Sequence, residues 1–166
     1  FSALKDAALL HLNIHLEALN YNVTLSDASA YNVQFHGVKP IFIDRLSFKR
    51  YIDGEFWVGH RQFCEQFLNP LLLRSVLGVA HNDWFRGSLD GISSETLAKI
   101  LPFMHKIRLK YLKHVILPAH LGKVSQESVA DMVERNQNKI KLPKNGLIAI
   151  LKELRKWIGS LNPADK

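Results

Sequence analysis

The residues of this sequence best suited to chemistry lie in two loops that flank a short β-hairpin. Asp27 and Asn32 belong to the segment that follows the first helical stretch, and Asp44 follows Ile43 after the hairpin. Phosphoryl transfer needs a carboxylate that orients the attacking hydroxyl or accepts its proton, and oxygen ligands that hold magnesium against the phosphates. The first loop could supply the carboxylate and one ligand, and the second loop another ligand.

The spacing of these three side chains resembles a known constellation. In protein kinases the catalytic-loop Asp is followed five positions later by an Asn, and a second Asp after the next hairpin binds the metal. Residues 3 to about 75 therefore resemble the C-terminal lobe of the protein-kinase-like fold, in particular the aminoglycoside-phosphotransferase type, whose metal loop also reads Ile-Asp. The resemblance implies that Asp27 is the catalytic Asp and that Asn32 and Asp44 are the ligands of Mg²⁺.

The same loops depart from the kinase pattern. Leu25 and Ser26 stand where a His and an Arg or Gly precede the catalytic Asp, and Arg45-Leu46 stand where Phe-Gly follows the metal-binding Asp. A kinase also grips its nucleotide with a Gly-rich loop and a strand-borne Lys of a first lobe, and neither is present here. We therefore expect that this segment alone does not hold ATP, and that phosphotransfer would need an N-lobe upstream.

A longer resemblance extends over residues 1 to about 120. It rests on six short segments, which are Leu4–Leu10, Asp27–Phe35, Pro40–Asp44, Arg61–Cys64, Phe67–Leu68 and Gly87–Ile92. Together they resemble the N-terminal region of bacterial, nodulation-type class I S-adenosylmethionine-dependent methyltransferases. In that family the methyltransferase domain follows this region, so the resemblance implies a parent protein that uses S-adenosylmethionine. The family's glycine-rich cofactor loop is missing here, because the late glycines Gly122, Gly146 and Gly159 are isolated.

Hydrophobic periodicity predicts a mainly α fold with one small β-hairpin, like a kinase C-lobe without its N-lobe. Leucines at three- and four-residue steps predict an amphipathic helix over residues 3–20, with Ser2 as its N-cap. Val, Phe and Ile on both sides of His36-Gly37 predict the hairpin at about residues 32–44. An aromatic-rich helical stretch from Trp57 to Val76 is expected to be interrupted near Pro70.

The remaining sequence predicts further helices separated by breakers. Asp90-Gly91 predicts a turn, and Ser93 or Ser94 should cap a helix that runs to Leu101. Three prolines separate apolar-periodic pieces at 103–117, 126–138 and 145–161. We expect three parts: a kinase-like helical lobe over 1–135, a linker over 136–146, and a C-terminal helix within 147–166 that leads to a downstream domain.

The charge of the chain is unevenly distributed. Residues 1–98 carry 8 Lys and Arg against 10 Asp and Glu, whereas residues 99–166 carry 14 against 5. A basic region of this kind can attract nucleic acid or acidic surfaces. We favour a solvated helical face without nucleic-acid binding, because the lysines and arginines between 106 and 113 alternate with aliphatic residues and not with exposed aromatics.

Several other side chains are of types that can take part in chemistry. His11 and His15 are four residues apart, a spacing that can place two imidazoles on one metal, but no Glu lies between them, so a surface or partly packed pair is expected. The single cysteine, Cys64, lies in an apolar run and is expected to be a buried structural thiol. Ser47 has no nearby His to activate it. The three tryptophans are expected to pack against helices.

The favoured interpretation is an accessory or substrate-positioning N-terminal domain of a bacterial, cytoplasmic methyltransferase, inactive and without a cofactor of its own. Its expected partners are a downstream methyltransferase domain in the same chain and an unknown acceptor, with no membrane partner, since no apolar run reaches the roughly 20 residues of a membrane span. One alternative is the catalytic lobe of a small-molecule phosphotransferase that uses Mg²⁺. Another is a non-enzymatic adaptor that uses its basic half.

Overall fold

The computed structural model describes residues 1–121 and 142–164. Helices dominate, and two small antiparallel sheets lie beside them. In order along the chain, the elements are α1 (Ser2–Asn20), β1 (Val23–Leu25), the 3₁₀ turn η1 (Ala30–Asn32), β2 (Val33–His36), β3 (Lys39–Phe42), β4 (Phe48–Arg50), α2 (His60–Phe63), the π turn η2 (Cys64–Leu68), α3 (Asn69–Leu77), α4 (Asn82–Gly87), α5 (Ser94–Ile100), α6 (Phe103–Lys106), α7 (Leu109–Tyr111), the π turn η3 (Leu112–Ile116), α8 (Leu117–Leu121) and α10 (Lys144–Ser160).

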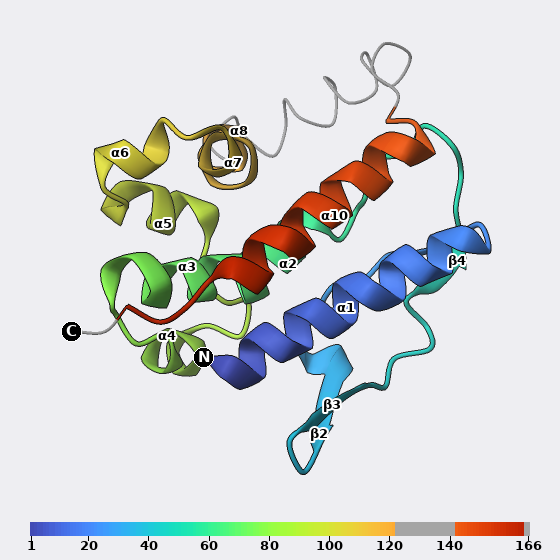
Figure 1. Cartoon of the computed structure of the whole chain (residues 1–166), viewed down its shortest axis with the longest axis horizontal. Helices are drawn as coiled ribbons and strands as arrows, with labels where there is room; N and C mark the ends of the chain where they lie inside the picture. The colour runs from blue at the N-terminus through green and yellow to red at the C-terminus, as the bar shows by residue number, and fades with distance from the viewer. Residues whose placement is uncertain (122–141, 165–166) are drawn as a thin grey trace.

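The two longest helices, α1 and α10, lie side by side and run in opposite directions across the molecule (Figure 1). Each buries an apolar stripe, which in α10 consists of Leu147, Leu151, Leu154, Trp157 and Ile158. Residues three and four apart share one face of a helix, so these side chains all point to the common core. The predicted helices at 3–20 and 145–161 are confirmed, and α10 is packed into the same core as α1.

The start of α1 differs from the prediction in one respect. Ser2 is the first helical residue and not the cap, and the N-cap is Phe1, which makes no side-chain cap hydrogen bond. The capping prediction is confirmed at α5, where Ser93 accepts a hydrogen bond from the Thr96 amide at 3.2 Å. A hydroxyl at this position satisfies one of the amides that the first helical turn leaves without a partner.

The β structure consists of two hairpin-like pairs, one enclosed by the other. The predicted hairpin is β2 with β3, and it projects from the helical body beneath α1 (Figure 1). The prediction of a single sheet is wrong, because β1 pairs with β4 on either side of this hairpin. The bond from the Ser26 amide to the Ser47 carbonyl, 2.8 Å, extends that pairing. Three-residue strands separated by more than twenty residues give little local signal, so their pairing requires the tertiary structure.

Two prolines that were expected to interrupt helices lie inside them. The chain is helical through Pro70 and through Pro118, and in each case a five-residue π turn ends two residues before the proline. Proline lacks an amide hydrogen, and its ring crowds the carbonyl four residues back. A π turn widens the helix at that place, because Asn69 and Leu117 each donate to the carbonyl five residues earlier. The predicted breaks at Pro70 and Pro118 are therefore wrong.

The first π turn is held from outside by the loop before α5. The Glu65 carbonyl accepts a hydrogen bond from the Ile92 amide at 2.8 Å. Gly91 lies against the same carbonyl with a φ of +82°, and a Cβ atom at this position would lie 2.3 Å from the Glu65 oxygen. The predicted turn at Asp90-Gly91 is confirmed, and only glycine fits it without a clash.

Part of the predicted organisation falls on residues that are not described. The predicted helix at 126–138 and most of the predicted linker at 136–146 lie outside the described residues, so both stay predictions. The predicted helix at 103–117 begins as two short helices, α6 and α7, separated at Ile107 and Arg108. Among the described helices, none combines the length and apolar character that crossing a membrane requires.

Candidate functional site

The loop after β1 is held in place by its own residues and by two glutamines, one from α2 and one from the π turn η2. The Asp27 carboxylate accepts a hydrogen bond from the Ser29 amide at 2.8 Å. Gln62 accepts a bond from the Ala28 amide at 2.9 Å, and buried Gln66 accepts one from the Ala30 amide at 2.7 Å. The loop conformation is thus fixed by bonds that do not require a ligand.

The two predicted metal ligands lie at the open end of the β2–β3 hairpin, where Asn32 precedes β2 and Asp44 follows β3. The Asn32 carbonyl accepts a bond from the Ile43 amide, 2.9 Å, so Asn32 continues the pairing of the two strands. Its side-chain nitrogen is buried without a hydrogen-bond partner. The Asp44 carboxylate accepts a bond from the Leu46 amide at 2.8 Å, which closes its own loop. The roles of Asp27, Asn32 and Asp44 in catalysis or metal binding stay predictions.

A cavity of about 540 Å³ opens beside the Asp27 loop. It is bounded by β1, β4 and the segment before α2, and its polar lining consists of Thr24, Ser26, Asp27, Lys49, Arg50, Tyr51 and Glu55. Asn32 and Asp44 are not among the residues that line it. Since charged residues of both signs and three residues with a hydroxyl line one space, this cavity can hold a small polar molecule by hydrogen bonds and ion pairs.

His11 and His15 are fully buried on the inner face of α1, so the expectation of a surface or partly packed pair is wrong. The His11 ring packs among Phe42, Phe63 and Phe67. His15 forms a 2.8 Å hydrogen bond with the Thr24 hydroxyl. Burial lowers the pKa of His11 to about 4, and burial together with His11 lowers the pKa of His15 to about 3. Both imidazoles are therefore neutral parts of an aromatic core.

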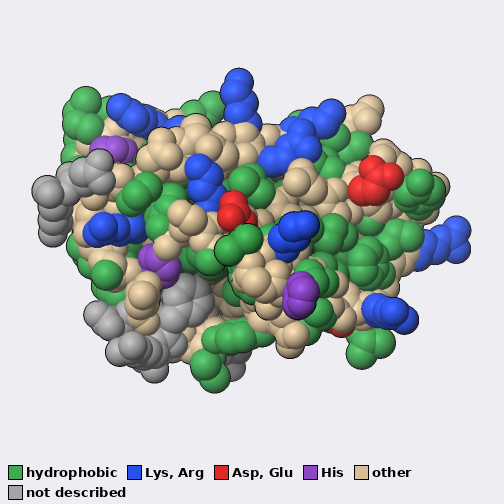
Figure 2. Space-filling view, turned by 60° about the horizontal axis from the view of Figure 1, so that its bottom comes forward, with side chains coloured by type: hydrophobic (Ala, Val, Ile, Leu, Met, Phe, Trp, Pro, Cys, Tyr) green, Lys and Arg blue, Asp and Glu red, His purple; other side chains and the backbone are tan. Residues whose placement is uncertain are grey.

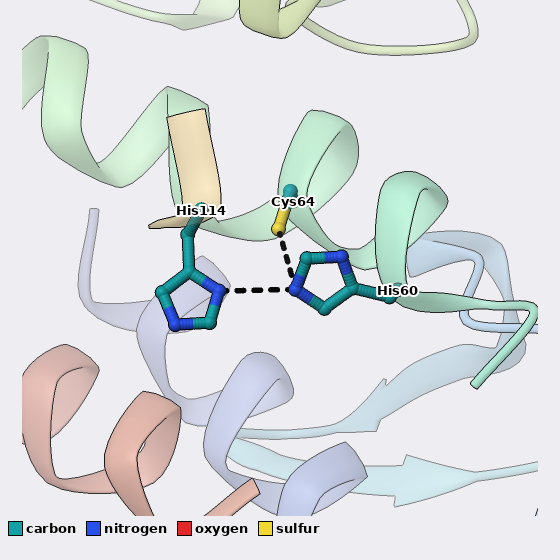
Figure 3. A group of neighbouring side chains, drawn as sticks. All are labelled: His60, Cys64 and His114. Carbon is teal, nitrogen blue, oxygen red and sulfur yellow. Dashed lines mark hydrogen bonds between the residues drawn. The ribbon is translucent and has the colours of Figure 1, made fainter. Parts of the chain in front are cut away.

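A second group of polar side chains gathers where the two π turns meet. His60 and Cys64 come from α2 and η2, His114 comes from η3, and the three side chains point toward one another (Figure 3). His60 Nε2 and His114 Nδ1 form a 3.0 Å hydrogen bond, and Cys64 Sγ lies 3.7 Å from the same His60 nitrogen. We call these residues the His-Cys-His cluster. Cys64 is 1% exposed, so the prediction of a buried thiol is confirmed.

The surroundings keep the cluster uncharged. Burial, followed by the Lys113 cation, lowers the pKa of His60 to about 4. Burial, His60 and Lys113 lower the pKa of His114 to about 4 against the opposing effect of Glu153. Burial and the nearby Glu65 raise the pKa of the Cys64 thiol. Two neutral imidazoles and one thiol therefore share a space from which water is largely excluded.

Both histidines of the cluster line a second cavity, of about 360 Å³. Its walls are mainly apolar, with Phe56, Trp57, Leu147 and Ile150 among them, and two cations, Arg61 and Lys113, lie at its edge. Lys113 pairs with Glu153 at 2.6 Å. The cavity gives a small ligand a path to the cluster.

The His-Cys-His cluster was not predicted from the sequence. The only local signal is that His60 and Cys64 are four residues apart, the spacing that drew attention to His11 and His15. His114 lies fifty residues further along the chain, and only the packing of the two π turns brings it close.

Lysine and arginine side chains are spread over the face drawn in Figure 2, with few acidic groups between them. Some basic residues of the second half of the chain have intramolecular partners. Lys110 lies over the Trp157 ring at 4.9 Å, and Lys113 pairs with Glu153.

Trp57 and Trp157 are buried against helices, as predicted.

Comparison with known proteins gives one curated relative. The chain is 48% identical over 163 residues to nodulation protein NoeA of Rhizobium meliloti (strain 1021). The match covers 97% of this chain and 34% of the relative, so the chain spans about a third of the length of that protein. No known protein-family model and no solved structure matches the chain. The predicted nodulation-type link is supported, whereas the methyltransferase class and the kinase-like fold stay predictions.

Proposed function

We propose that this chain is an accessory, substrate-positioning region of a longer nodulation-type protein whose catalytic domain transfers a methyl group from S-adenosylmethionine. The cavity beside the Asp27 loop is the part that would receive the acceptor. Its mixed charges and hydroxyls suit a small polar molecule or a polar group of a larger one.

The observation that carries the proposal is that the carboxylates of Asp27 and Asp44 form hydrogen bonds within their own loops. A metal-binding or catalytic carboxylate directs its oxygens to the metal or the substrate, whereas Asp27 and Asp44 each use one oxygen to accept a hydrogen bond from a backbone amide of their own loop. This supports a structural form of the loops over a phosphotransferase. The similarity to about a third of a nodulation protein supports a role as one part of a longer chain.

Phosphotransfer remains the alternative, since an Asx-type bond can coexist with a metal ligand on the second carboxylate oxygen. It would require Mg²⁺ on Asn32 and Asp44, and a nucleotide held by residues outside this chain.

The test uses calorimetry on this chain and methyl transfer by the full-length nodulation relative. We expect this chain to bind neither S-adenosylmethionine nor ATP with Mg²⁺. We expect the full-length relative to bind S-adenosylmethionine and to label an acceptor in extracts of its own cells, and removal of the region matching this chain should reduce labelling but leave S-adenosylmethionine binding intact. Micromolar binding of either ligand by this chain, or unchanged labelling without the region, would overturn the proposal.

A further inference from the structure

We propose that His60, Cys64 and His114 form a binding site for one divalent transition-metal ion, with Zn²⁺ as the expected occupant and the fourth position open to the neighbouring cavity. This inference is independent of the proposed function, because it uses other residues and another cavity.

The spacing of the donor atoms fits such an ion. In tetrahedral zinc sites the Zn–N and Zn–S bonds are about 2.0–2.1 Å and 2.3 Å, which separates two nitrogens by about 3.3 Å and a nitrogen from a sulfur by about 3.6 Å. The observed separations are 3.0 Å between His60 and His114, and 3.7 Å between His60 and Cys64. All three donor atoms lie within 4.8 Å of one another, so small side-chain rotations bring them around one ion.

A second observation concerns the outer nitrogen of His114. This side chain is fully buried, yet its Nε2 has no hydrogen-bond partner, and the Glu153 carboxylate lies 3.9 Å away, beyond hydrogen-bond distance. A metal on Nδ1 fixes the proton on Nε2, and histidine ligands commonly donate that proton to a carboxylate. Metal binding would thus give the outer nitrogen of His114 a carboxylate acceptor that it lacks in the metal-free arrangement, in addition to the existing pair of Glu153 with Lys113.

The backbone at the cluster also differs from ordinary helix. Cys64 begins one π turn and His114 lies within the other. Single π turns inside α-helices are frequent at functional sites, because they displace side chains from the regular helical face. Here they place two donors from distant parts of the chain opposite each other.

The donor set indicates the class of ion. Imidazole and thiolate suit zinc and copper, whereas magnesium and calcium prefer oxygen ligands. Three protein ligands with an open fourth position match zinc sites that keep a water or substrate molecule. The cavity, with Lys113 and Arg61 at its edge, could supply that molecule, and the two cations favour an anion.

The test is metal titration of the full chain, purified with chelator and then supplied with Zn²⁺ in competition with a chromophoric chelator, and separately with Co²⁺. We expect one Zn²⁺ per chain with submicromolar affinity, and for Co²⁺ a thiolate-to-metal absorption band. Cys64→Ala should remove the band and weaken Zn²⁺ binding by more than about 100-fold, beyond the effect of losing an outer-shell partner. Co²⁺ bound more tightly than Zn²⁺ in the same competition would overturn the assignment of zinc.

Two further variants keep the result interpretable if Cys64→Ala does not fold. Glu153→Gln, on the outer side of His114, should fold normally by circular dichroism and weaken Zn²⁺ binding by about 10-fold or more. His36→Gln removes an exposed histidine of the hairpin and should change neither the circular dichroism spectrum nor the affinity for Zn²⁺. Less than half an ion per chain, no thiolate band, or equal affinity in the Glu153→Gln and His36→Gln variants would overturn the site.

Discussion

The Asp27 loop and the His-Cys-His cluster are two polar regions of one core, and they relate to the sequence in opposite ways. The loop has a conspicuous pattern of carboxylates and amide, but its carboxylates are occupied by neighbouring backbone amides. The cluster has almost no local pattern, yet its donor atoms face one another and leave a buried nitrogen without a partner. The difference teaches that spacing along the chain identifies residues that could meet, whereas donor atoms that converge in space identify residues that can share one ligand.

The largest expected effect tests whether the buried histidines are neutral parts of the core. His11 and His15 have folded pKa values of about 4 and 3, below the ordinary 6.5. The unfolded chain therefore takes up more protons below pH 6.5, and the stability is lost as the pH falls from 6.5 toward 4. The loss should reach on the order of 5 kcal/mol for the pair by pH 4.5. Urea unfolding between pH 7.5 and 4.5 measures it.

One variant isolates His11 in that titration. His11→Phe, in a site already lined by Phe42, Phe63 and Phe67, should flatten the curve by up to about 1.4 kcal/mol per pH unit, the contribution of one proton. His36→Gln, at an exposed position, should leave the curve unchanged. An unaltered slope in His11→Phe would mean that His11 titrates normally in the folded protein.

The next largest change in stability is expected at Gly91, which lies against the π turn η2. Gly91→Ala should lower the free energy of unfolding by about 3–5 kcal/mol, since it combines a left-handed backbone with a severe contact to the Glu65 carbonyl. Gly37→Ala is the matched control, because Gly37 has a φ of +62° but open space around it. It should cost only about 1–2 kcal/mol. Equal losses in chemical denaturation would show that the contact with η2 is unimportant.

A smaller loss of stability is expected when the Asp27 loop loses its hydrogen bonds to Gln66. Gln66→Leu leaves the Ala30 amide and the Ser29 hydroxyl without their acceptor, and we expect a loss of about 1–3 kcal/mol in chemical denaturation. Gln66→Glu keeps an acceptor at this place and should cost less near neutral pH. If both variants are as stable as the parent chain, the loop is not held by this side chain.

The smallest effect concerns the carboxylates themselves. Asp27→Ala should cost about 1 kcal/mol, and Asp44→Ala less than about 1 kcal/mol, because the Leu46 amide that it bonds is exposed and can turn to water. The two Asn variants keep an acceptor oxygen and should cost less than the Ala variants. Thermal melts of the four variants measure this, and four melting temperatures equal to that of the parent chain would remove the structural role assigned to these groups.

Local patterns predicted the elements that local forces determine. The stripes of α1 and α10, the hairpin around Gly37 and the Ser93 cap all depend on residues close together in sequence. The β1–β4 pair was missed because its strands are short and the β2–β3 hairpin lies between them along the chain.

The prolines and the buried histidines were misread for another reason. A proline predicts a lost hydrogen bond, but not whether the helix widens to accommodate the loss, as it does at Pro70 and Pro118. The polarity of histidine suggests a surface, but His11 and His15 lie on the stripe that packing selects for the interior. The candidate site at the cluster depends on a tertiary contact between His60 and His114, 54 positions apart, which no short window of sequence contains.

The two π turns also constrain how the length of this chain can vary. A π turn accommodates one residue more than the α-helical path, and each residue turns a helix by about 100°. Deleting one residue between Cys64 and Leu68 would therefore let the π turn return to regular α-helix without rotating α3, and the fully buried Leu71, Leu72 and Leu73 would keep their places in the core. The same holds for α8 after Leu112–Ile116. Single-residue gaps between relatives of this chain should therefore fall in these two segments and not elsewhere in the same helices, where a gap would rotate the buried stripe out of the core.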